Sequence, residues 1–119
     1  MEFRFGVEFN FTMLSGDAPD RWYEIDGVKP VDQPNLGGRG EHKDVRGVSL
    51  HDAWENFSVH LSWSPAADLW RVPIDTISQS EAGFERVYQS SCLLPHWCVR
   101  LAPGEVFNLS LSLTVNDRA

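Results

Sequence analysis

The side chains with the broadest chemistry in this sequence are four histidines and two cysteines, which can bind metal ions or act as acids, bases and nucleophiles. They are His42, His51, His60, His96, Cys92 and Cys98. None of them forms a Cys-x-x-Cys pair or a His-Glu-x-x-His unit, and His96-Trp97-Cys98 falls short of the four ligands of a structural zinc site. No Ser lies in a Gly-x-Ser-x-Gly context. The sequence therefore predicts no metal site, no cofactor and no catalytic nucleophile.

Paired carboxylates could hydrolyse a glycoside, and the candidate pairs are Glu81 with Glu85 and Asp68 with Asp75. A glycosidase needs such groups about 5 to 9 Å apart in a cleft, with the pKa of one of them raised. Spacing along strands and turns does not indicate that arrangement, so we interpret these acids as solvated or salt-bridged surface groups. We expect that the chain by itself is not an enzyme.

Aromatic side chains are the remaining candidates for a binding site, because flat rings can either fill a core or stack on sugar rings. Trp63 and Trp70 occupy the apolar phase of alternating segments, which predicts core packing for both. Trp22, Tyr23 and Trp54 adjoin turns or polar residues, so an exposed position is favoured more for these three than for Trp63 and Trp70. The residues that we take as candidates for sugar contact are Trp22, Tyr23, Trp54 and Trp97. For each of them core or interface packing is nevertheless the favoured interpretation, ahead of ligand binding.

The elements that must position these residues have the period of strands. Apolar residues alternate with polar ones over residues 3–13, which predicts a strand with one buried face. Residues 22–25 predict a short strand, and Asp26-Gly27 predicts the turn of a hairpin. Proline and glycine then punctuate residues 30–44, which we interpret as a polar surface excursion.

The second half of the chain repeats the alternation. Residues 57–63 alternate up to Pro65, which we expect to end the strand, and residues 70–76 alternate again, with Pro73 predicting an edge or a bulge. Residues 87–101 are less regular because Pro95 interrupts them, and a reverse turn at 102–105 leads to a closing strand at 107–115. Strands of this kind joined by Gly/Pro turns predict an all-β fold, an antiparallel β-sandwich or part of one.

Length and composition restrict the class of protein. The chain has 119 residues, of which 42% are hydrophobic and 23% charged, which predicts one globular β-sandwich domain over residues 1–119. Seventeen acidic residues against ten basic ones give a net charge of −7, which argues against nucleic acid as a partner. No apolar run approaches the length of about 20 residues that spans a bilayer, and no signal peptide is evident. We therefore expect no membrane partner and a cytoplasmic location.

Several segments carry a family resemblance, above all residues 69–89, which read Leu-Trp-Arg-Val-Pro-Ile-Asp-Thr-Ile-Ser-Gln-Ser-Glu-Ala-Gly-Phe-Glu-Arg-Val-Tyr-Gln. This stretch resembles the C-terminal domain of the α-amylases and 4-α-glucanotransferases of glycoside hydrolase family 57, in which a Trp-x-x-Pro strand runs into Thr-x-Ser-Gln-Ser-Glu-x-Gly-Phe-Glu and a Tyr-Gln step. The segments 5–11, 16–23, 94–97 and 101–105 are similar to that domain in the same order. The resemblance covers nearly the whole chain.

The resemblance implies a galactose-mutarotase-like sandwich, a super-sandwich or part of one, which packs on a separate (β/α)7 barrel that carries the catalytic carboxylates. The chain would then be a C-terminal module excised from a larger enzyme, with the catalytic barrel domain as its partner. Residues 78–88 are the segment we expect to face the barrel or an α-1,4-glucan, through Gln79, Glu81, Glu85 and Arg86. The structural alternative is that Gln79 and Glu81 satisfy backbone groups in a tight loop.

Two other functions stay open from the sequence. The first is an independent carbohydrate-binding module, which exposed coplanar Trp or Tyr side chains would favour. The second is a subunit-interaction domain, for example in a homodimer, which never contacts sugar and which a broad apolar patch would favour.

Overall fold

The computed structural model describes residues 1–13, 15–81 and 83–117, and for Ser80 the backbone only. These residues form strands, turns and loops, and no helix among them has the length and hydropathy needed to cross a bilayer. The strands are β1 (Glu2–Gly6), β2 (Phe9–Phe11), β3 (Arg21–Ile25), β4 (Gly40–Asp52), β5 (Phe57–Ser80), β6 (Gly83–Arg100) and β7 (Ser110–Asp117).

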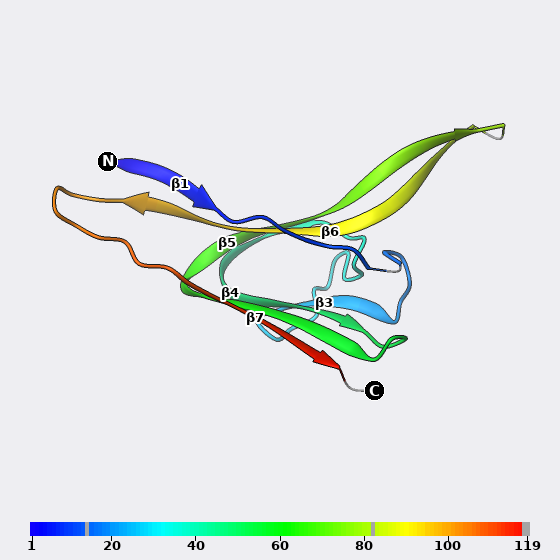
Figure 1. The fold of residues 1–119 in the computed structure, drawn as a ribbon, viewed down its shortest axis with the longest axis horizontal. Helices are drawn as coiled ribbons and strands as arrows, with labels where there is room; N and C mark the ends of the chain where they lie inside the picture. The colour runs from blue at the N-terminus through cyan, green and yellow to red at the C-terminus, as the bar shows by residue number, and fades with distance from the viewer. Residues whose placement is uncertain (14, 82, 118–119) are drawn as a thin grey trace.

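The strands form one antiparallel sheet in the order β1-β6-β5-β4-β3, with β2 beside β6 and β7 beside β5. The 24-residue β5 connects the two halves of this sheet, because its first part pairs with β4 and β7 and its second part with β6. The sheet curls along β5, so that β1 and β6 lie above β3, β4 and β7 (Figure 1). The prediction of an all-β antiparallel sandwich is confirmed.

The core fills the space between these two layers. Val59, Leu61 and Trp63 of β5 are at most 5% exposed, and Trp97 of β6 faces them at 4%. The rings of Trp63 and Trp97 meet edge to face at 6.4 Å, a favourable geometry for aromatic pairs. Each indole N–H also has an acceptor, since Trp63 donates to the Val45 carbonyl at 2.7 Å and Trp97 to the Pro65 carbonyl at 2.9 Å. The core position predicted for Trp63 is therefore confirmed.

Two predicted turns are confirmed by their hydrogen bonds. After β3, Asp26 and Gly27 have φ values of 49° and 81°, as a two-residue hairpin turn requires. Ile25 and Val28 exchange backbone hydrogen bonds of 2.8 and 3.0 Å across it. At residues 102–105 the Glu105 amide donates to the Ala102 carbonyl at 3.0 Å.

The prolines act differently from one another. Pro73 lies beyond the last β4–β5 pair, Gly40 with Arg71, so its edge position is confirmed. The strand end expected at Pro65 is wrong, because β5 continues through it, and β6 likewise continues through Pro95. Pro95 lies opposite the break between β1 and β2, where a missing N–H removes no ladder hydrogen bond.

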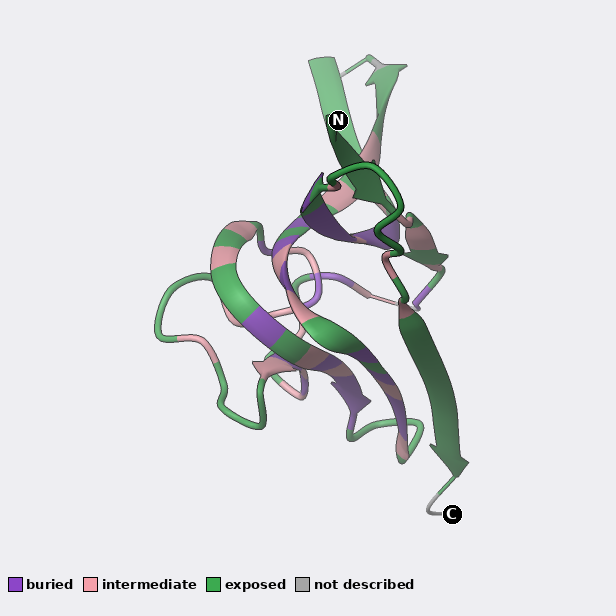
Figure 2. Ribbon diagram, turned by 90° about the vertical axis from the view of Figure 1, so that its left-hand side faces the viewer, coloured by how far each residue is buried: buried purple, intermediate pink, exposed green. Residues whose placement is uncertain are grey.

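Three sequence predictions need correction. The last third of the expected polar excursion, residues 40–44, belongs to β4, whose alternation is obscured by register shifts between His42 and Val45 and between Val45 and Gly47. The predicted strand over residues 3–13 is divided into β1 and β2. The apolar sides of the two edge strands are only partly covered: Phe5 in β1 is 42% exposed and Leu113 in β7 is 56% exposed. Figure 2 shows both strands as exposed.

Candidate functional site

A two-stranded arm projects from the sandwich. Beyond Ser91, where β2 stops pairing with β6, the end of β5 and the start of β6 pair only with each other. They leave the body as a long twisted hairpin (Figure 1). We call residues 75–81 and 83–88 the arm. It carries Gln79, Glu81, Glu85 and Arg86, so the structure brings these four predicted site residues together on one projecting element.

The register of the arm sorts its side chains onto two faces. Gln79 pairs with Phe84 and Ile77 with Arg86, so these four residues share one face, which we call the arm face. On this face Ile77 is 68% exposed and Phe84 is 79% exposed. Glu85 lies on the opposite face, and Glu81 lies in the turn at the tip. The arm face therefore combines exposed apolar surface with an amide and a guanidinium group.

A polar hollow of about 320 Å³ lies at the root of the arm, and we call it the arm hollow. It is lined by Asp17, Gln33, Gly37, Arg39, Pro73, Asp75, Arg86 and Tyr88. Arg86 approaches Asp75 to 3.9 Å from Nε to Oδ2. Asp17, Asp75, Arg86 and Tyr88 come from the segments that carry the family resemblance, so the fold brings residues from two distant segments together here.

Close packing around Tyr88 explains the glycine before Asp17. A Cβ at Gly16 would lie 2.7 Å from Cδ2 of Tyr88, so a side chain cannot fit there without moving the ring. The Gly37 amide donates to the Gly16 carbonyl at 2.7 Å, which fixes the loop across the hollow. Burial raises the pKa of Tyr88, whose hydroxyl lies 2.6 Å from that of Ser91.

A buried arginine holds the other wall of the arm hollow. Arg71 is 1% exposed and donates to the carbonyl of Asp32 at 3.0 Å and to that of Gln33. Its guanidinium also lies 5.2 Å from the centre of the Tyr23 ring and donates to Nε2 of His42 at 2.9 Å. Burial, and then the charge of Arg71, lower the pKa of His42, which favours the neutral ring that can accept this bond.

The predicted aromatic candidates do not form one platform. Tyr23 is fully buried and Trp97 is 4% exposed, so both rings belong to the core, as the packing interpretation has it, and neither presents a face to a sugar. Trp22 is half-buried, with its ring 5.3 Å from that of His51. Only Trp54, at 73% exposure in the β4–β5 turn, presents most of its ring to solvent.

The sequence prediction missed an exposed indole. Trp70 is 42% exposed, so its predicted core position is wrong. Odd-numbered residues are buried from Val59 to Trp63 and again from Ala67 to Arg71, with the exposed Pro65 between them. The same phase continues because β5 does not break at Pro65. The alternation of residues 57–63, carried forward, would have placed Trp70 on the outer face.

One row of side chains has the order of a catalytic triad, but its serine is inaccessible. Oγ of Ser58 lies 2.8 Å from Nδ1 of His51, whose Nε2 contacts a carboxylate oxygen of Glu24. Ser58 is 2% exposed and sits within β5 between β4 and β7, so a substrate cannot reach its hydroxyl in this structure. We interpret the row as cross-strand pairing.

The other chemical candidates are also placed by the structure. Within the described ranges no three His, Cys, Asp or Glu residues are arranged to hold a metal ion. Burial tends to raise the pKa of Asp68, but hydrogen bonds from Lys43 and from the Asp44 amide outweigh it and lower the pKa. A general acid of a glycosidase needs the opposite shift.

The fold and this surface define an antiparallel β-sandwich domain with a projecting arm. The family described as "Alpha-amylase/4-alpha-glucanotransferase, C-terminal" matches residues 1–111, and the chain belongs to that family. It is 30% identical over 112 residues to Alpha-amylase 1 of Dictyoglomus thermophilum. The matched stretch covers 93% of this chain and 15% of the length of that relative. No solved structure matches the chain, so the galactose-mutarotase-like arrangement stays a prediction.

Proposed function

We propose that the chain is the non-catalytic accessory module of an α-glucan-acting amylase or 4-α-glucanotransferase, and that its arm packs on the catalytic domain. Membership of the C-terminal domain family supports this proposal, as does the small share of the amylase relative that the chain spans. On this proposal the chemistry takes place in the catalytic domain, and residues 1–119 act as one module that stabilises it.

The exposed arm face carries the proposal. A hairpin of two strands is marginally stable in water unless another surface covers it. The arm nevertheless presents Ile77 and Phe84 diagonally across one face, 68% and 79% exposed. Gln79 and Arg86 occupy the other diagonal of these four positions, so the face mixes exposed apolar surface with polar groups. Aromatic residues and Arg are enriched at protein interfaces. Packing on the catalytic domain would cover this face and order the arm.

The polar residues around the arm would set the orientation of the contact. The arm hollow presents Asp17 and Asp75 together with Arg39 and Arg86, so both signs of charge are available to a partner surface. Glu81 lies in the turn at the tip of the arm. We propose that it contacts the catalytic domain close to the α-1,4-glucan.

A second candidate function is direct sugar binding, because Trp54 is 73% exposed. In that case the chain would act as a carbohydrate-binding module independently of the arm.

A second copy of the chain, in a homodimer, could cover the arm face instead of the catalytic domain. The mass of the enzyme in solution distinguishes these two arrangements. The free thiols of Cys92 and Cys98 support a reducing compartment, for which we propose the cytoplasm.

The docking of the arm is tested in the chain together with its catalytic domain, which we call the intact polypeptide. Glu81→Ala and Arg86→Ala should each lower α-glucan turnover or the thermal midpoint, because they remove contacts of the arm. The matched controls are Glu55→Ala and Arg100→Ala, which change exposed residues of the same types outside the arm. If the arm variants alter neither turnover nor midpoint, the proposed docking is refuted.

A further inference from the structure

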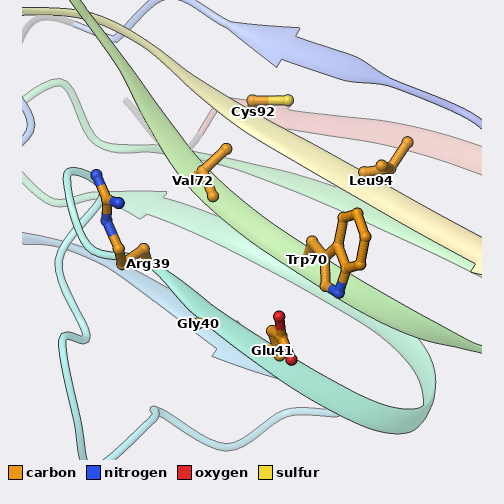
Figure 3. A pocket seen from close by; sticks show the side chains of 7 residues that line it. All are labelled: Arg39, Gly40, Glu41, Trp70, Val72, Cys92 and Leu94. Atoms are coloured by element: carbon orange, nitrogen blue, oxygen red, sulfur yellow. The ribbon is translucent and has the colours of Figure 1, made fainter.

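A second hollow lies on the outer face of the upper layer, away from the core. This groove has a volume of about 380 Å³ and is lined by Arg39, Gly40, Glu41, Trp70, Val72, Cys92 and Leu94. Figure 3 shows the indole of Trp70 standing on β5, with Leu94 of β6 on one side and Glu41 of β4 on the other. The volume lies within the range of about 300–1,000 Å³ that is common for small-molecule sites.

The side chains of this groove suit a sugar ring. The indole of Trp70 and the neighbouring Val72 are 42% and 39% exposed, which gives an apolar wall for the C–H face of a pyranose. Glu41 can accept hydrogen bonds from hydroxyl groups, and Arg39 can donate to their oxygens. Both are exposed and lie beside the apolar wall, so they can reach hydroxyls at the rim of a stacked ring.

The platform is held by regular structure. Trp70 lies in the middle of the sheet, where it pairs with Glu41 on β4 and with Leu94 on β6. The ring of His96, which is 6% exposed, lies 4.6 Å from the indole and supports it. A binding group on paired strands is positioned more precisely than one on a loop.

The other described aromatic surfaces fit a sugar less well. The hollow beside Trp22 has a volume of only about 90 Å³, and Trp54 does not line it. The arm hollow is larger, but its ring, Tyr88, is half-buried with its hydroxyl bonded to Ser91. Only the groove at Trp70 combines an exposed indole, an apolar wall and two polar groups.

We propose that this groove is a binding subsite for an α-1,4-linked glucose chain, with Trp70 as the stacking platform and Glu41 and Arg39 as hydrogen-bonding groups. The choice of an α-1,4-glucan rests on the proposed function, whereas the choice of a sugar rests on the groove itself. Trp70 and Val72 of the groove lie on the opposite face of β5 from Pro73 and Asp75 of the arm hollow, and Arg39 borders both hollows. Trp70 and Glu41 line the groove but not the arm hollow, so they test the sugar site apart from docking.

The test is a titration of the chain with maltoheptaose, followed by NMR through the indole N–H signals of its five tryptophans. A Trp70→Phe variant assigns the Trp70 signal. We expect saturable shifts of that signal, a loss of affinity of at least about tenfold in Trp70→Ala, and a loss of about threefold in Glu41→Gln. Trp54→Ala is the matched control, because it removes an exposed indole outside the groove and should change the affinity less than twofold.

The outcomes separate this site from the proposed function. If Trp70→Ala unfolds the chain, as seen by circular dichroism, then Arg39→Ala and Glu41→Gln decide, because both residues are exposed. If maltoheptaose shows no saturable binding up to about 20 mM, which is on the order of the weakest useful affinities, the subsite is overturned. The proposed docking of the arm would be unaffected by that result. Binding that depends on Trp54 would also overturn it and would support the independent module. Equal affinity for cellohexaose would overturn the α-1,4 assignment.

Discussion

Replacing Phe84 by alanine tests whether the arm face is covered in the enzyme. In the isolated chain this ring is 79% exposed near the tip of a two-stranded hairpin. Substitutions of exposed residues usually change the free energy of unfolding by less than about 0.5 kcal/mol. We therefore expect Phe84→Ala to leave the stability of the isolated chain almost unchanged.

In the intact polypeptide the expected effect is larger. A phenylalanine buries about 150–250 Å² when fully covered, so covering the exposed 79% would remove roughly 120–200 Å² from water. At about 25 cal/mol per Å² this is at most about 3–5 kcal/mol. Ordering of the arm on docking reduces the net contribution, and we expect a loss of about 1–3 kcal/mol.

Scanning calorimetry of the variant and the parent sequence measures both effects. For the isolated chain a loss of about 0.5 kcal/mol lowers the thermal midpoint by at most about 2 °C. In the intact polypeptide we expect a larger downward shift of the transition in which this module unfolds. The control is Val106→Ala, which changes an apolar residue that is 77% exposed outside the arm. Equal and small shifts for Phe84→Ala in the isolated chain and in the intact polypeptide would refute the reasoning.

Three further predictions concern the chain alone. Burial lowers the pKa values of His42 and His96 from the ordinary 6.5, so the unfolded chain binds more protons near that pH, and the free energy of unfolding should fall on acidification below about 6.5. Urea unfolding at pH 5 and pH 7.5 measures this difference, and equal midpoints would contradict it. Arg71→Met leaves two loop carbonyls without their donor and should lower the free energy of unfolding by about 3 kcal/mol or more. The control, Arg100→Met at an exposed position, should lower it by about 0.5 kcal/mol or less. Equal losses for the two variants would refute the anchoring role of Arg71. Burial and Glu8 raise the pKa of Cys92 to about 11, so iodoacetamide at pH 8 should modify the exposed Cys98 first. Peptide mass spectrometry measures the order of modification, and faster alkylation of Cys92 would be inconsistent with this prediction.

Local periodicity predicted most strands because one buried face leaves a clear period of two. It failed where the chain departs from that geometry. In β4, two register shifts break the period, and the polar residues His42-Lys43-Asp44 gave the segment the composition of a loop. In β7 the alternation is regular, but the strand pairs only with β5, and its apolar side is 36–62% exposed at Leu111, Leu113 and Val115. A pattern of side chains cannot show what lies over a face.

The site was partly predictable for the same reason. Gln79, Glu81, Glu85 and Arg86 are polar residues around a turn, and composition alone predicts that they lie on a surface. Their projection on an arm depends on where β2 and β4 stop pairing, which is a long-range property of the sheet. The phase of Trp70 was available from residues 57–63, but the assumed strand end at Pro65 hid it.

Hydrogen exchange of the arm tests the proposed role of the chain most directly. Backbone amides of residues 75–81 and 83–88 lie in a ribbon without further strands beside it, so they should exchange rapidly in the isolated chain. Packing on the catalytic domain should slow their exchange at least about tenfold in the intact polypeptide, while amides of the sandwich core change little. The same exchange rates for the arm in both forms would contradict the account, because the arm would then have no partner in the enzyme.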